Sequence, residues 1–128
     1  AREERVAKAD QFLLEMKKTV KKVTELLQDS KRTEFIVVTI AESMAVRETE
    51  DLINTLEKFR IPSNHIIINN IFPKEDSDFT KIKRKNQEKY LEEIKKKFGK
   101  HIITEIILQP TEIQGLKGLE ILGKKLFA

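Results

Sequence analysis

Two short apolar runs, separated by one amphipathic segment, limit what this chain can fold into. Residues Glu34–Ile40 and His65–Ile71 are mostly apolar and β-branched. Between them, apolar residues recur at helical spacing: Met44, Val46, Leu52, Ile53, Leu56 and Phe59. A strand, a crossover helix and a second strand form a βαβ unit, and strands this continuously apolar are typical of buried parallel sheets. The segment therefore predicts an α/β protein.

The rest of the chain adds three helices and one strand. A single apolar stripe predicts a long helix over Arg2–Gln28. A second helix is predicted over about Phe79–Phe98, where Gly99 is placed to end it in a left-handed conformation. His101–Leu108 is predicted to be a strand and Gly115–Phe127 a short last helix. The predicted order is α-β-α-β-α-β-α.

This order predicts how the layers stack. Right-handed crossovers place both crossover helices on one face of the sheet. We expect the first and last helices to cover the opposite face, because no other element remains. The result is a three-layer αβα sandwich with a small parallel sheet of three strands. Ser43 is placed to cap the helix after the first strand, and Pro62 prevents that helix from continuing beyond about Arg60.

Composition excludes several classes of site and of partner. The 128 residues amount to one domain and contain no cysteine, so no disulfide or thiolate metal site can form. The 25 basic and 21 acidic residues leave a net charge of +4, which indicates a solvated surface rather than a nucleic-acid footprint. No apolar run approaches the roughly 18 residues of a membrane span. We expect a cytoplasmic protein that is not an integral membrane protein and binds no nucleic acid.

Ligands of open parallel sheets bind beyond the carboxyl ends of the strands. Three loops lie there in the predicted fold: 41–43, 69–70 and 108–112. Asn69 is the most informative residue, because its amide both donates and accepts and so matches the edge of adenine. Taken alone, Asn69 is more simply a residue that satisfies loop backbone, and Glu42 is more simply a solvated loop residue.

Phosphate-binding and metal-binding motifs are missing from the sequence. No G-x-x-x-x-G-K-(S/T) loop is present, so no cradle of backbone N–H groups exists for a triphosphate. His65 and His101 both open strands and lack a second ligand at metal-binding spacing, which indicates structural roles. No nucleophile and base are visible as a pair.

Four blocks, in order and at compatible spacing, resemble one family. F-I-V-V-T-I-A-E-S-M-A-V-R-E-T-E resembles F-V-x-V-x-I-(P/A)-E-x-(L/M)-(A/S)-x-x-E-T-E. I-P-S-N-H-I-I-I-N-N resembles a strand ending in V-N-(Q/R/K), and F-T-K-I-K-R-K-N-Q-E-K-Y-L-E-E-I resembles a segment with Q-x-K-Y-L-x-x-I. P-T-E-I-Q-G-L resembles E-(I/V)-R-G-L. The family is that of the ArsA-type ATPases, and its most similar members are the archaeal and eukaryotic ATPases that target tail-anchored membrane proteins. The chain looks archaeal-like.

The resemblance implies a dimeric P-loop ATPase that uses ATP or ADP with Mg²⁺, of which this chain looks like the C-terminal part. Residues 1–30 would be a remnant of the client-binding helical subdomain. Residues 31–128 would be the C-terminal part of the nucleotide-binding domain, a partial P-loop NTPase fold without its P-loop half. Such a chain should not hydrolyse ATP alone, and no nucleotide should bind tightly to it. The alternative is a free-standing, non-catalytic interaction module of the same fold.

The resemblance also assigns residues to the nucleotide. The family residue aligned with Asn69 contacts adenine. The loop that lies against the adenine ring aligns with four residues here: Ile107, Leu108, Gln109 and Pro110. The family's zinc-binding C-x-x-C aligns with Ser77 and Thr80, so we expect no zinc. Two family arginines and the adenine-loop proline are also replaced: Asp51, Gln114 and Ile107.

Two surfaces are candidates for partners. One lies on the apolar stripe of the first helix: Phe12, Leu13, Met16 and Val20. These residues most simply pack against the sheet, and the family alternative is that they bind apolar segments of membrane proteins. The other surface is the Glu34–Ile40 edge, which in the family pairs with the strand of the phosphate loop. A bare apolar edge recruits another chain, so we expect it to pair with another copy or with the missing N-terminal half.

Overall fold

The computed structural model describes residues 1–74 and 77–127. Its helices and strands follow in the predicted order: α1 (Arg2–Gln28), β1 (Ile36–Ile40), α2 (Ser43–Lys58), β2 (His65–Ile71), α3 (Asp78–Lys97), β3 (Ile102–Ile107) and α4 (Gly115–Leu126). The strands form one parallel three-stranded sheet in the order β1-β2-β3. The predicted α/β class and the small parallel sheet are therefore confirmed.

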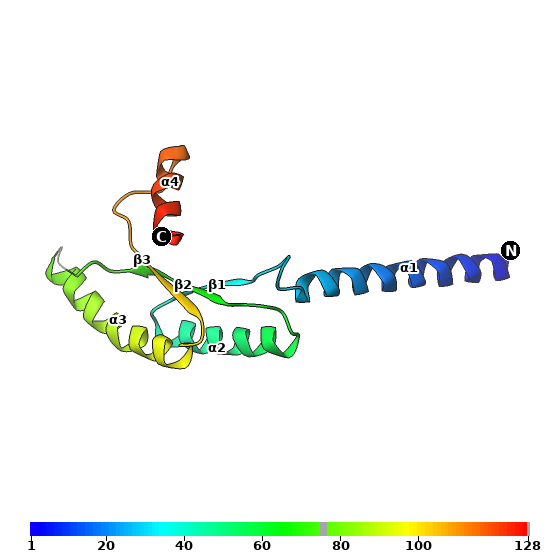
Figure 1. The fold of residues 1–128 in the computed structure, drawn as a ribbon, viewed down its shortest axis with the longest axis horizontal. Helices are drawn as coiled ribbons and strands as arrows, with labels where there is room; N and C mark the ends of the chain where they lie inside the picture. The colour runs from blue at the N-terminus through cyan, green and yellow to red at the C-terminus, as the bar shows by residue number, and fades with distance from the viewer. Residues whose placement is uncertain (75–76, 128) are drawn as a thin grey trace.

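One face of the sheet carries the core. Val37 and Thr39 of β1 pair in register with Ile66 and Ile68 of β2, and all four side chains are buried. The two crossover helices α2 and α3 lie together against this face (Figure 1). These helices, with the residue that ends α3, contribute further large core residues: Val46, Ile53, Leu56, Leu91, Ile94 and Phe98. Burying one such side chain stabilises the fold by about 1.5–3 kcal/mol, so this layer carries most of the stability.

The opposite face of the sheet is largely open. Val38 of β1 is 61% exposed and Ile102 of β3 is 58% exposed. α4 lies on this side, at the end of β3 (Figure 1). Ile106 also points to this face of β3 but is buried, unlike Val38 and Ile102. The face that we expected two helices to cover is thus covered by one short helix at one end.

The prediction that α1 also covers this face is wrong. α1 extends away from the sheet, and none of its residues is buried (Figure 1). Its C-terminal end is held by hydrogen bonds from Thr33 Oγ1 to the Leu26 carbonyl (2.7 Å) and from Gln28 Nε2 to the Phe59 carbonyl (2.8 Å). A helix of 27 residues is about 40 Å long, whereas three strands span only about 10 Å. The sheet is too small to cover the helix.

Two helix ends differ from prediction. Ser43 does not cap α2: it is the first residue of the helix, Glu42 is the N-cap, and no side-chain capping bond forms. α2 ends with a left-handed Arg60 (φ 57°), while the Ile61 N–H bonds to the Leu56 carbonyl, as in a Schellman motif. Gly99 does not adopt a positive φ. A Cβ there would lie 3.1 Å from the Lys95 carbonyl oxygen, so the glycine provides space instead.

Candidate functional site: a cleft at the carboxyl ends of the strands

Asn69 and the loop after β3 line the same cleft. The cleft has a volume of about 470 Å³, within the range of small-molecule sites. It is bounded by all five residues that the family resemblance assigns to the base: Asn69, Ile107, Leu108, Gln109 and Pro110. Asn69 and the loop are almost forty positions apart in the sequence, yet β2 and β3 are neighbours in a parallel sheet. Their carboxyl ends therefore bring these residues together.

The loop after β1 does not join them. A separate hollow of about 360 Å³ lies between β1 and α2, and Asn69 reaches its border as well. Glu42 is exposed and lines neither space. Of the three loops selected from the topology, the second and third therefore share one site, whereas the first lies apart from it.

The side-chain amide of Asn69 is available to a ligand. Asn69 pairs with Ile40 across the sheet and is half-buried. Within the described residues, its side chain makes no hydrogen bond, whereas Gln87 of α3 satisfies the backbone that follows it. In this structure it is thus the Gln87 side chain, and not that of Asn69, that satisfies the loop backbone. Sequence reasoning missed Gln87, although it lies in the Q-E-K-Y-L block that carries part of the family resemblance.

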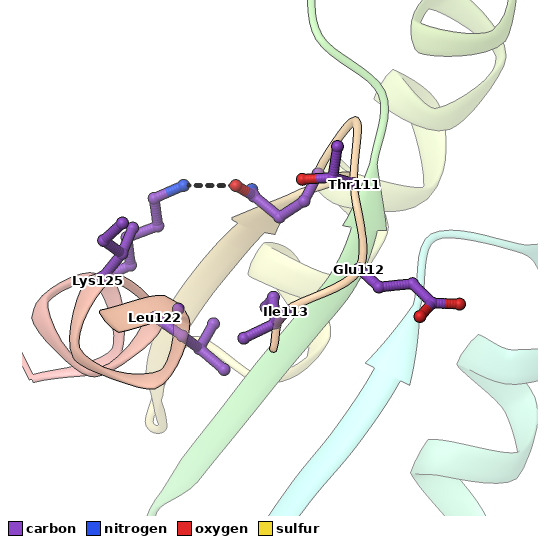
Figure 2. A pocket seen from close by; sticks show the side chains of 8 residues that line it. Thr111, Glu112, Ile113, Leu122 and Lys125 are labelled. Carbon is purple, nitrogen blue, oxygen red and sulfur yellow. Dashed lines mark hydrogen bonds between the residues drawn. The ribbon is translucent and has the colours of Figure 1, made fainter. Parts of the chain in front are cut away.

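The other wall of the cleft is a loop held in place by α4. Gln109 donates through Nε2 to the Ile107 carbonyl (2.5 Å) and accepts through Oε1 from Lys125 Nζ (3.0 Å). Figure 2 shows this second bond, with Ile113 and Leu122 between the loop and the helix. Both ends of the Gln109 amide are occupied. This wall therefore offers a ligand the apolar side chains of Ile107, Leu108 and Pro110, and farther along the loop the polar side chains of Thr111 and Glu112.

A smaller space behind this loop is less suited to a base. It is lined by Gln109, Thr111, Glu112, Ile113 and the facing residues of α4 (Figure 2). Its volume of about 100 Å³ is well below the roughly 300 Å³ at which small-molecule pockets begin. The larger cleft beside Asn69 is therefore the candidate site.

Ser77 and Thr80, which align with the family's zinc ligands, form the N-terminal cap of α3. The Thr80 N–H donates to Ser77 Oγ (3.2 Å), and the Ser77 N–H donates to Thr80 Oγ1 (2.9 Å). Among residues 1–74 and 77–127, no three side chains of the metal-binding kinds gather in one place. The expectation that this chain takes no zinc stays a prediction.

The apolar stripe of α1 does not pack against the sheet. Phe12, Met16 and Val20 border a shallow hollow of about 290 Å³ on α1, and Leu13 is also exposed. The simpler interpretation of these residues, as core of the sheet, is thus wrong. No helix of the described part is both long enough and apolar enough to cross a bilayer.

The end of the sheet opposite the cleft carries a carboxylate–imidazole pair. Glu34 Oε1 lies 2.5 Å from His65 Nδ1, and both side chains are about one-third exposed. The hydrogen bond from His65, with the charge of that ring and hydrogen bonds from Asn64, holds the pKa of Glu34 below its usual value, although burial acts in the other direction. The pair links the start of β2 to the residues before β1, which fits the structural role predicted for His65.

We expect replacement Glu34→Gln to lower stability at neutral pH and to have a smaller effect in acid. A carboxyl whose pKa is lower in the folded state stabilises the fold above its unfolded pKa, and this contribution is lost as the pH falls through the folded value. Thermal unfolding at pH 7 and at about pH 2 would measure this, because the lower pH lies well below the unfolded pKa of Glu34. Exposed Glu57→Gln is the control. An effect of Glu34→Gln that is equal at both pH values would contradict the account.

The fold and the cleft define the class of protein. An open parallel sheet with two crossover helices on one face, and a cleft at its carboxyl end, is part of a P-loop NTPase-type α/β fold. The model of the family described as anion-transporting ATPase matches residues 2–128. This chain therefore belongs to the ArsA family of anion-transporting ATPases.

Individual relatives agree with this assignment. The chain is 36% identical over 126 residues to the ATPase GET3B of Arabidopsis thaliana, a match that covers 95% of this chain and 31% of the relative. It is 35% identical over 106 residues to the ATPase ASNA1 homolog 2 of Paramecium tetraurelia, covering 82% of this chain and 33% of the relative. An ATPase ASNA1 homolog of Entamoeba histolytica is 36% identical over 110 residues, with 85% and 34% covered. The chain thus spans about a third of the length of these curated relatives. Its archaeal-like character stays a prediction.

Proposed function

We propose that this chain forms the adenine side of the ATP site in an ArsA-family ATPase. The observation that carries the proposal is the convergence of Asn69 and Ile107–Pro110 on one cleft of about 470 Å³. These are the positions at which family members contact the base. The free amide of Asn69 and the apolar side chains of Ile107, Leu108 and Pro110 are what a flat, uncharged base with a polar edge requires.

The chemistry of recognition follows from the two walls. The Asn69 amide donates to N7 of adenine and accepts from its exocyclic amino group, while Leu108 and Pro110 pack against the ring. Guanine has an acceptor in place of the amino group, so the Asn69 oxygen would be left without a donor. A bidentate pair of this kind discriminates between bases by about 1–3 kcal/mol. The phosphates, and the Mg²⁺ that neutralises their charge, are held by residues outside this chain.

Asn69→Ala should weaken binding of ADP by about tenfold, because one bidentate pair contributes about 1–3 kcal/mol. Titration of the wild-type chain with ADP, followed by amide chemical shifts, should move the signals of Asn69 and Ile107–Pro110. Asn54→Ala is the matched control, since Asn54 is an exposed asparagine on α2, away from the cleft. GDP should produce smaller shifts than ADP at the same concentration. Shifts spread over the whole surface, or an unchanged response of Asn69→Ala, would refute the proposal.

The exposed stripe on α1 is the second part of the proposal. Phe12, Leu13, Met16 and Val20 form an apolar strip that nothing in the described chain covers. We propose that it contributes to a surface for apolar segments of membrane proteins, as in the targeting members of the family. The length of α1 suits this role, since a helix of about 40 Å can lie along a membrane-spanning segment over its whole apolar length.

The alternative is a non-catalytic interaction module that kept the fold. The replacement of the family's adenine-loop proline by Ile107, and of its second arginine by Gln114, favours this alternative. Gln114 occupies the N-cap position of α4 without a side-chain capping bond, and its Nε2 donates to Glu112 Oε2 (2.9 Å). A parent gene that encodes G-K-G-G-(I/V/T)-G-K-(S/T) ahead of this segment would favour the ATPase, and the absence of such a loop would favour the module.

A further inference from the structure

Gln87 holds the backbone that follows Asn69. This residue of α3 is 8% exposed, and its Oε1 accepts a hydrogen bond from the Phe72 N–H (2.9 Å). Its Nε2 donates to the Asn70 carbonyl (3.0 Å). A residue of a neighbouring parallel strand bonds in the same way, to the residues on either side of its partner. The side-chain amide thus takes the place of a strand just beyond Ile40, where β1 ends.

The backbone that Gln87 holds is irregular. Ile68 pairs with Glu105 and Ile71 pairs with Ile107, so β2 contains one residue more than β3 over this stretch. Asn70 lies in this bulge with a left-handed φ of 55°. A residue other than glycine keeps that conformation only where its surroundings hold it. A bulge changes the direction in which adjacent side chains point, and Asn69 immediately precedes the left-handed residue.

We propose that Gln87 is a positioning residue of the nucleotide cleft. By bonding to Asn70 and Phe72, it fixes the bulge and so the direction in which Asn69 presents its amide. The inference rests on the proposed adenine-binding role of Asn69 and deepens it. Gln87 does not touch the base, because the residues that line the cleft do not include it.

Both ends of the Gln87 amide are needed. A flipped amide would set its donor against the Phe72 N–H and its oxygen against the Asn70 carbonyl. Glutamate has nearly the same shape, but the ionised carboxylate has no hydrogen to donate to a carbonyl. Protonation would restore one O–H donor. We call the two hydrogen bonds of Gln87, to Phe72 and to Asn70, the Gln87 clamp. Gln87→Glu therefore loses the bond to the Asn70 carbonyl at neutral pH and recovers it in acid.

The experiment compares wild type, Gln87→Glu and Ile94→Val. Ile94 is fully buried on the same helix, so Ile94→Val lowers stability without touching the clamp. Without nucleotide, Gln87→Glu should displace the signals of the Asn69 side-chain amide and the Phe72 N–H, and Ile94→Val should not. With ADP, Gln87→Glu should bind about tenfold more weakly than wild type at neutral pH. Acidification should return the Asn69 and Phe72 signals toward their wild-type positions.

The outcomes separate this inference from the proposed function. If wild type responds to ADP at Asn69 and Gln87→Glu responds equally with unmoved signals, the positioning role is wrong and the adenine site stands. If wild type does not respond to ADP, the adenine site is wrong, and the nucleotide-free signals of Asn69 still test the clamp. Should Gln87→Glu fail to fold, Gln87→Leu removes both hydrogen bonds without adding a charge and is judged by the same signals.

Discussion

Ile66→Ala will cost about 2–5 kcal/mol of the free energy of unfolding. Ile66 is fully buried at the centre of the sheet, where β1 and β3 flank it and α2 and α3 cover it. Truncation removes three methyl or methylene groups and leaves a cavity that the surrounding strands cannot close. Domains of this size have only about 5–15 kcal/mol of stability in total, so a large fraction of it should disappear. Urea unfolding followed by circular dichroism would measure the loss.

The control for this prediction is Ile102→Ala on the neighbouring strand. Ile102 is 58% exposed on the open face. It pairs with His65, the residue before Ile66, in the same sheet. The same chemical change there should cost about 1 kcal/mol or less, since little apolar surface leaves a buried environment. Equal losses at the two positions would mean that the two faces of the sheet are equally covered, contrary to the structure.

We expect the chain to self-associate through the edge of β1 and Val38→Lys to convert the resulting oligomers into a monomer. β1 pairs with β2 along one edge, and along its other edge it pairs with no strand of the described residues. Val38 lies at the middle of that strand, 61% exposed on the open face. An apolar edge of this kind pairs with another chain, and a lysine prevents such pairing by placing a charge in the new interface. Analytical ultracentrifugation at high concentration should show oligomers for wild type and a monomer for the variant.

Val20→Lys is matched to this change. Val20 is about as exposed as Val38, at 62%, but it lies on α1 and not on the unpaired edge of β1. If self-association uses β1 and the open face, Val20→Lys should leave the oligomers intact. If Val20→Lys disperses them and Val38→Lys does not, the stripe on α1 is the surface of association. A wild-type chain that stays monomeric at high concentration would contradict association through either surface.

Local patterns predicted the fold of this chain well. The run Ile66–Ile68 is β-branched throughout and becomes the central strand, which β1 and β3 flank, because such residues suit an extended backbone. Helical spacing located α1 to α4 because apolar residues three and four positions apart fall on one face of a helix. The position of the cleft also followed from topology, since parallel neighbours bring their carboxyl ends together.

Features that depend on contacts between distant residues were predicted less well. Arg60 rather than glycine ends α2 in a left-handed conformation, because the Ile61–Leu56 bond and the packing of Ile61 hold it there. Gln87 stands in a charged helix with no periodic signal of its own. Its importance comes from two backbone groups that β2 leaves unpaired 15 and 17 positions earlier.

The sequence by itself determined the order of helices and strands, the parallel sheet and the resemblance to one ATPase family. It could do so because strand and helix periods are local, and because four blocks that resemble the family follow one another along the chain at compatible spacing. Only the tertiary structure decided that α1 leaves the sheet, that Asn69 keeps its amide free, and that Gln87 holds the bulge beside it. These three features depend on which polar groups and apolar surfaces remain unpaired after the sheet has formed. Contacts between residues distant in sequence decide this, and neighbouring residues do not.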